Sequence, residues 1–221
     1  MDDPKRMVAH GYNNIKENYL ELIESMGLAV RDKYMKVLMD NLPAGAQILE
    51  LGCGAGLPMT KHLASRFKVT GVDISEEQLR LAVSNVPDAT FVIVDMTQLS
   101  YCDSSFDAVV AFYSITHVPR GEHLRLLTDI YRILKPDGLL VATMGAGDLP
   151  DTIEPDWLGV PMFFSHFDGK TNVALVKKVG FKVISAIDER ELENERPVCF
   201  RWIVGRKPAD KVFPKTYLSQ K

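Results

Sequence analysis

The stretch that most constrains the fold of this chain is residues 46–56, AQILELGCGAG, where an apolar run of strand type meets three glycines. Gly52, Gly54 and Gly56 stand at every second position, and a stretch of helical pattern follows them. Glycines so spaced let a strand-to-helix turn bring bare backbone against a ligand, which a Cβ would block. The stretch therefore predicts a ligand-binding strand–turn–helix unit.

A second feature narrows the choice of ligand. Residues 69–72, VTGV, form a short strand pattern that ends in Asp73, 21 residues beyond Gly52. An acidic residue at about that distance binds a ribose diol in nucleotide-binding units. Leu57 stands where a dinucleotide fingerprint has its third glycine, and Glu50 supplies a carboxylate that suits an ammonium group better than a pyrophosphate. We therefore expect an adenosine-containing cofactor other than NAD.

Composition bounds the class of protein. A chain of 221 residues, 46% of them apolar and 25% charged, fits one α/β domain with a sizeable core. The net charge of −3 gives no long-range attraction for nucleic acid, and no apolar run approaches the ~20 residues of a membrane helix. Cys53, Cys102 and Cys199 form neither a disulfide framework nor a metal pattern. We expect a cytoplasmic protein without a signal peptide, a metal or a membrane partner.

From residue 46 onward, strand patterns alternate with helical ones, which is typical of a parallel sheet with helices on both faces. Residues 13–41 carry helical periodicity with a break near Gly27, and the second of these two helices spans 30–41. The segment 188–196 is too short for a helical crossover, so the last two strands should form an antiparallel hairpin. The expected strands are 46–51, 68–73, 90–94, 106–112, 138–144, 181–187 and 198–205, and the later helices are 57–66, 75–85, 121–134 and 170–179, with Gly180 as a C-cap.

Five segments, in this order and at these spacings, resemble the class I S-adenosylmethionine-dependent methyltransferases. They are ILELGCGAG, GVDIS (71–75), FVIVDM (91–96), FDAVVAFYSITHV (106–118) and LKPDGLLVAT (134–143), and from first to last they span residues 48–143, nearly half of the chain. The resemblance implies a single α/β domain, 1–221, with a Rossmann-like, mostly parallel sheet of seven strands in the order 3-2-1-4-5-7-6. The last strand would be antiparallel, residues 1–44 a helical lid and residues 145–169 a loop on the acceptor side.

The same resemblance assigns a cofactor, S-adenosyl-L-methionine, with S-adenosyl-L-homocysteine as its product. Asp73 would hold the ribose hydroxyls, and Glu50 would lie near the ammonium group. Asp95 would receive the adenine amino group, unless it only terminates its strand, and Ile74 and Met96 would flank the ring. The full set expected to bind the cofactor is Tyr12, Tyr19, Glu50, Gly52, Cys53, Gly54, Asp73, Ile74, Asp95, Met96 and Phe112.

Tyr12 and Tyr19 resemble an N-terminal pair that closes over the methionine end of the cofactor in small-molecule methyltransferases. An aromatic face also stabilises a sulfonium by cation–π attraction. For Tyr19, a place in the core of its helix is an equal alternative.

On the acceptor side, methyl transfer needs mainly orientation and exclusion of water, and a base only where the acceptor is a hydroxyl. A histidine at the position of His117 works with an N-terminal tyrosine in phosphoethanolamine methyltransferases, although it could simply bind loop backbone. His166 lies in an aromatic segment, 156–168, that either packs on the sheet or walls a pocket for a small, flat, partly apolar acceptor. The residues expected to bind the acceptor are Tyr113, His117, Trp157, Phe164 and His166, with His117 and His166 as candidate general bases.

The chain also lacks signatures of other acceptor classes. Residues 112–115, FYSI, do not match the Asn/Asp-Pro-Pro-Tyr/Phe motif of DNA and protein amide or amine methyltransferases, and no Pro-Cys nucleophile is present. The first hypothesis is therefore a small-molecule methyltransferase without a nucleic-acid partner. A methyltransferase acting on protein or RNA and a cofactor-binding protein without turnover are the alternatives. The sequence leaves the oligomeric state open.

Overall fold

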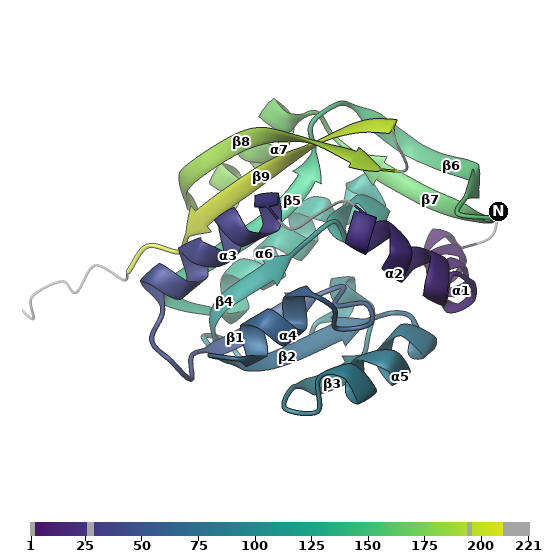
Figure 1. Ribbon diagram of the computed structural model, residues 1–221. Coiled ribbons are helices and arrows are strands. Elements are labelled where there is room, and N and C mark those ends of the chain that lie inside the picture. Colours follow the sequence, from purple (N-terminus) through teal and green to yellow (C-terminus); the bar gives the residue numbers. More distant parts are fainter. Residues whose placement is uncertain (1–2, 26–28, 194–195, 210–221) are drawn as a thin grey trace, which may run out of the picture.

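The computed structural model describes residues 3–25, 29–193 and 196–209. Within them, a seven-stranded sheet has the order β3-β2-β1-β4-β5-β9-β8, and a separate two-stranded sheet pairs β6 with β7 (Figure 1). The strands are β1 (Gln47–Leu51), β2 (Lys68–Asp73), β3 (Thr90–Ile93), β4 (Phe106–Ala111), β5 (Leu134–Gly145), β6 (Leu149–Trp157), β7 (Val160–His166), β8 (Lys182–Glu193) and β9 (Arg196–Arg206).

The sheet confirms the expected fold class. The pairs from β3 through β5 are parallel, and β9 runs antiparallel to both β5 and β8. Once β6 and β7 are set aside, the order is the 3-2-1-4-5-7-6 that the sequence predicts. Parallel strands leave their carboxyl ends at one edge, which is where open α/β sheets bind ligands.

The helices are α1 (Pro4–Asn14), α2 (Lys16–Ser25), α3 (Ala29–Asn41), α4 (Met59–Ala64), α5 (Glu76–Asn85), α6 (His123–Ile133) and α7 (Gly169–Val179), with 3₁₀ turns η1 (Met96–Gln98), η2 (Ile115–His117) and η3 (Arg120–Glu122). The helical periodicity begins only at residue 13, so α1 was expected only through the helical lid, 1–44, that the resemblance implies. The start signal of α1 is present, because Asp3 accepts from the backbone N–H of Lys5 and Pro4 takes the first helical position. The expected break at Gly27 falls outside the described residues. Gly180 caps α7 at φ +117°, as predicted.

Helices cover both faces of the sheet (Figure 1). On one face α6 contributes Leu126, Leu127 and Ile130 to the core. On the other face α3 and α4 contribute Met35 and Leu63. Burial of each such side chain contributes roughly 1.5–3 kcal/mol. A sheet covered twice explains why residues 108–112 read as a continuous apolar run.

The expectation that residues 145–169 form a loop is wrong. β6 and β7 pair antiparallel through a turn at Leu158 and Gly159, both of which have positive φ. The helix α1 lies against this hairpin so closely that a Cβ on Gly11 would come within 2.6 Å of Met162 Cε. Aromatic residues spaced along the two strands therefore have a covered face, which a loop would not give them.

The β8–β9 hairpin is longer than expected. β9 leaves β5 at the pair Gly145–Phe200, yet β8 and β9 continue to pair as far as Glu193 and Arg196. The charged segment 188–193 is thus strand, and it extends the hairpin beyond the sheet. Trp157 Nε1 donates to Glu193 Oε1 at 2.8 Å, so this projecting end meets the β6–β7 hairpin.

Candidate functional site

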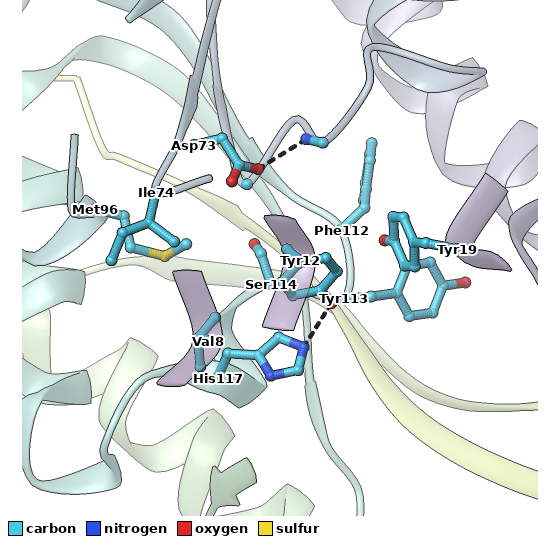
Figure 2. Close-up of a pocket in the computed structure, with 12 residues that line it drawn as sticks. Val8, Tyr12, Tyr19, Asp73, Ile74, Met96, Phe112, Tyr113, Ser114 and His117 are labelled. Carbon is cyan, nitrogen blue, oxygen red and sulfur yellow. Dashed lines mark hydrogen bonds between the residues drawn. The ribbon is translucent and has the colours of Figure 1, made fainter. Parts of the chain in front are cut away.

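A cavity of about 430 Å³ lies at the carboxyl ends of β1, β2 and β4 (Figure 2). Residues from α1 and α2 close its other side. It brings together ten of the residues expected from the sequence, which are Tyr12, Tyr19, Gly52, Gly54, Asp73, Ile74, Met96, Phe112, Tyr113 and His117. Val8 and Ser114 complete the lining.

The glycine turn leaves this cavity open. Gly52 and Gly54 have φ of +72° and +53°, which L side chains rarely adopt. A Cβ on Gly52 would overlap the side chain of Ser114, and one on Gly54 would stand 3.6 Å from the ring of Tyr19. The positive φ therefore favours glycine at both positions, and at Gly52 the available space requires it as well, as expected of a backbone that approaches a ligand.

Asp73 ends β2 at the edge of the cavity, and the backbone fixes its carboxylate. Oδ2 accepts from the N–H of Gly54 at 2.8 Å (Figure 2). Oδ1 accepts from the N–H of Ser75, also at 2.8 Å. Burial raises the pKa of Asp73, while these N–H groups stabilise its ionised form. Each oxygen keeps a lone pair that a ligand hydroxyl can use.

A second cavity of about 380 Å³ adjoins the glycine turn, and two ionisable side chains in its lining, Glu50 and Arg31, are buried. Glu50 accepts from the hydroxyl of Thr60 at 2.6 Å, and burial raises the pKa of Glu50 to about 8. Arg31, only 1% exposed, has its guanidinium 4.7 Å from the ring centre of Tyr113. A carboxyl and a guanidinium in one cavity fit a ligand that carries an ammonium and a carboxylate.

Arg31 was not predicted. Its signal was an arginine on the face of α3 that also carries Tyr34 and Leu38, both buried. Cys53 also lines this second cavity, with burial raising the pKa of its thiol. The structure thus places Cys53 beside the expected cofactor residues, behind the turn.

A third cavity, about 370 Å³, continues past Ile74 and Met96 to Asp95. Oδ1 of Asp95 accepts from the N–H and the hydroxyl of Thr97, and Oδ2 lies 3.0 Å from Lys5 Nζ. Burial opposes ionisation, but the hydrogen bonds from Thr97 and Lys5 lower the pKa of Asp95. Asp95 therefore caps η1 and also lines a cavity. Lys5 was not predicted, because the helical periodicity begins only at residue 13.

In the first cavity, at the glycine turn, Tyr12 of α1 contacts His117, which follows β4 in the turn η2. The hydroxyl of Tyr12 lies 2.9 Å from Nε2 of His117, whose Nδ1 lies 2.8 Å from the carbonyl oxygen of Phe163. Because a carbonyl only accepts, Nδ1 carries the proton and Nε2 accepts from Tyr12. Burial lowers the pKa of His117 to about 4 and raises that of Tyr12. The pair is neutral at pH 7.

Beyond this pair lies an aromatic chamber of about 350 Å³. We use this name for the space bounded by the rings of Tyr12, Tyr19, His117, Trp157 and Phe164, whose neighbouring ring centres are 4.7–6.2 Å apart. Burial raises the pKa of Tyr19 to about 12, and its ring lines the chamber as well as the cofactor-side cavity.

A wide groove of about 1380 Å³ opens from the chamber, between the β6–β7 hairpin and the end of β8–β9. It shares Trp157, Phe164 and Glu193 with the chamber. His166 lines this groove and binds the carbonyl oxygen of Gly147 through Nδ1 at 2.8 Å. The structure therefore brings His117 into the cavity at the glycine turn and leaves His166 in the outer groove.

Across residues 3–25, 29–193 and 196–209, no group of three or more His, Cys, Asp or Glu side chains is arranged to hold a metal ion. None of the helices described is long and apolar enough to cross a membrane.

The profile of the family described as Methyltransferase domain matches residues 48–138. An O-methyltransferase of Pyrenophora dematioidea is 30% identical over 205 residues, which cover 86% of this chain and 72% of that protein. The protein named methyltransferase YqeM of Bacillus subtilis (strain 168) is 33% identical over 123 residues, 53% of this chain, and the match spans only 50% of its length.

Solved structures share the fold. A SAM-dependent methyltransferase from Methanosarcina mazei superposes with a TM-score of 0.69 at 23% identity, covering 79% of this chain and 98% of that one. At this identity the likeness concerns the architecture alone.

Proposed function

The chain belongs to the class I S-adenosylmethionine-dependent methyltransferases, and from this premise we propose that it transfers a methyl group to a small-molecule acceptor. The observation that carries the proposal is the position of Tyr12 and His117. Both line the cavity at the glycine turn and both line the aromatic chamber. A methyl donor in the first space and an acceptor in the second would meet at this pair.

The residues around the three inner cavities fit the cofactor. Asp73 would accept hydrogen bonds from the ribose hydroxyls, and Glu50 and Arg31 would hold the ammonium and carboxylate of the amino-acid end. Asp95 would accept from the amino group at the edge of the adenine. Ile74 and Met96 would flank the adenine ring. When bound, S-adenosylmethionine supplies an electrophilic methyl group on a sulfonium. The charge-assisted hydrogen bonds made by Asp73, Glu50 and Arg31 would contribute roughly 1.5–3 kcal/mol each.

His117 is the group that would hold a proton from an acceptor hydroxyl. Its Nε2 lone pair already accepts a hydrogen bond from Tyr12, so the hydroxyl of Tyr12 would pass its own proton to Nε2 and take up the proton of the acceptor. A pKa near 4 keeps the imidazole unprotonated but makes it a weak base. Orientation and exclusion of water by the aromatic rings should therefore supply the larger share of the rate. The proposal does not depend on whether oxygen, nitrogen, sulfur or carbon is methylated.

The aromatic chamber supports a flat or partly apolar acceptor. Its five rings present faces and edges without a fixed charge, since His117 is neutral at pH 7. The outer groove adds Glu154, Asp156 and Glu193 against a single Arg196. This lining argues against an RNA acceptor, because phosphates require basic residues. The open groove is, however, the feature that would suit the alternative of a protein acceptor.

The experiment has two parts. Calorimetry should show that S-adenosylhomocysteine binds and that NAD does not. Methyl-labelled S-adenosylmethionine is then offered with fractionated metabolites, protein and RNA. We expect label in the metabolite fraction. Label confined to protein or RNA would replace the small-molecule proposal by its alternative, and binding without label in any fraction would indicate a binding protein without turnover.

A further inference from the structure

Gln78 is a fully buried side chain in the first turn of α5, and its two polar atoms differ in how they are used. Nε2 donates to the carbonyl oxygen of Tyr12 at 3.3 Å, which fixes the orientation of the amide. Oε1 has no hydrogen-bond partner, and within the described residues only three other buried side-chain atoms share this state. Buried amide oxygens are nearly always paired, so this one indicates a missing partner.

The unpartnered oxygen faces the glycine turn. Oε1 of Gln78 lies 3.7 Å from the point that a Cβ on Gly54 would occupy. The N–H of Gly54 donates to Asp73 Oδ2, so the carboxylate and the amide oxygen are neighbours of the same glycine. The other three unpartnered atoms belong to His123, Asn172 and Trp202, none of which is among the side chains that a Cβ on Gly54 would meet. The missing partner therefore belongs where Asp73 is expected to bind a sugar.

We propose that Gln78 is a positioning residue whose Oε1 accepts a hydrogen bond from a ribose hydroxyl of the cofactor, and whose Nε2 ties that sugar to the N-terminal helix. The inference rests on the proposed methyltransferase function and adds to it a residue and a linkage. The backbone carbonyl oxygen of Tyr12 accepts from Nε2 of Gln78, and the hydroxyl of Tyr12 donates to His117. Binding of the cofactor's sugar would thus hold Tyr12, which lines the aromatic chamber, in position.

A separate contact anchors the same helix without involving the sugar. Oδ1 of Asn13 accepts from the hydroxyl of Ser75 at 2.7 Å and from the N–H of Glu77 at 3.2 Å. Asn13→Ala should loosen α1 while leaving Oε1 of Gln78 in place. It is therefore the matched control for the sugar contact.

The test compares ligands that differ by one hydroxyl. Calorimetry is run with S-adenosylhomocysteine and with its 2′-deoxy and 3′-deoxy analogues on the wild type, Gln78→Met, Gln78→Glu and Asn13→Ala. We expect Gln78→Met to bind S-adenosylhomocysteine about tenfold more weakly. Wild-type affinity should fall when the hydroxyl that contacts Oε1, either 2′ or 3′, is removed from the ligand. In Gln78→Met this loss of affinity should be about tenfold smaller. Gln78→Glu keeps an acceptor and should keep the wild-type loss, as should Asn13→Ala.

The linkage to α1 has its own readout. Hydrogen exchange of residues 4–14 should slow when S-adenosylhomocysteine binds the wild type, and should slow less in Gln78→Met, which lacks the donor to Tyr12. An equal loss of affinity for all three ligands in Gln78→Met would overturn the sugar contact. Undiminished protection of α1 in Gln78→Met would overturn the linkage. Failure of the wild type to bind any of the ligands would instead remove the proposed function. Thermal melting establishes that each variant is folded, and Gln78→Leu, which also lacks both polar atoms, replaces Gln78→Met should that variant not fold.

Discussion

The inner half of the site and its outer half are built in different ways. The inner half follows the carboxyl ends of β1 and β2, and backbone N–H groups hold its key carboxylate, Asp73. The outer half depends on contacts between side chains far apart in the chain, as between Tyr12 and His117, 105 residues apart. Local backbone geometry therefore determines the cofactor side, and tertiary packing determines the acceptor side.

The two halves also differ in charge. Glu50, Arg31 and Asp73 place charged or ionisable groups around the inner cavities, whereas the rings of the aromatic chamber include a neutral histidine, and Glu193 adds one carboxylate where the chamber meets the outer groove. The inner half should therefore bind its ligand mainly through charge-assisted hydrogen bonds. The outer half should select the acceptor mainly by the shape of the space between its rings. Substitutions in each half should then affect different measurements.

The largest separation should come from the two histidines. We expect His117→Gln to lower kcat by about 10²–10⁴-fold for a hydroxyl acceptor, because the proton loses its acceptor. The affinity for S-adenosylhomocysteine should change less than about threefold, since His117 is assigned to the acceptor. Because burial lowers the pKa of His117 to about 4, activity should fall only as the pH approaches that value.

His166→Ala is the matched control, because that side chain lies in the outer groove. Its kcat should stay close to that of the wild type. An unchanged kcat in His117→Gln, or an equal loss in both variants, would contradict the role that we assign to His117.

Asp73→Asn tests the inner half. The amide keeps one acceptor oxygen but replaces the other by a donor, which faces the N–H of either Ser75 or Gly54. With two charge-assisted hydrogen bonds to the sugar weakened as well, we expect about a hundredfold loss of affinity for S-adenosylhomocysteine by calorimetry. Should affinity fall less than in Asp95→Asn, the sugar is not bound at Asp73.

Sequence patterns predicted the backbone of the inner half better than that of the outer half. The glycine turn, Asp73 and the strand order are local patterns, and each lies where the sequence placed it. The turn of Leu158 and Gly159 was not read as a hairpin, because the residues around it carry aromatics and prolines without strict alternation. Lys5 and Arg31 were not found since their roles depend on how α1 and α3 pack, which periodicity does not give. The pairing of Tyr12 with His117 was anticipated only through the resemblance to a family.

A pH series sharpens the account of the inner half. Burial raises the pKa of Glu50 to about 8 from an ordinary 4.5. The stability that this group contributes is therefore present below about pH 4.5 and is lost as the pH rises through about 8. Relative to Glu50→Gln, the wild type should lose on the order of 2–4 kcal/mol between pH 5 and pH 9, measured by urea unfolding without ligand.

S-adenosylhomocysteine should reverse part of this loss, since an ammonium beside Glu50 favours its ionised form. Calorimetry in two buffers of different ionisation enthalpy should detect release of a proton on binding near pH 7. Parallel stability profiles for the wild type and Glu50→Gln would show that Glu50 titrates normally.

The smallest expected effect tests the outer half where the two hairpins meet. Trp157→Phe keeps an aromatic ring in the chamber but removes the N–H that donates to Glu193. A hydrogen bond to a charged group contributes about 1.5–3 kcal/mol when buried and less near solvent, so we expect KM for the acceptor to rise about two- to fivefold. The affinity for S-adenosylhomocysteine should not change. Glu193→Gln keeps an acceptor and should have a smaller effect, and the double variant should be no worse than Trp157→Phe alone. Additive effects would mean that the two side chains act independently, and the contact between the hairpins would then not shape the acceptor site.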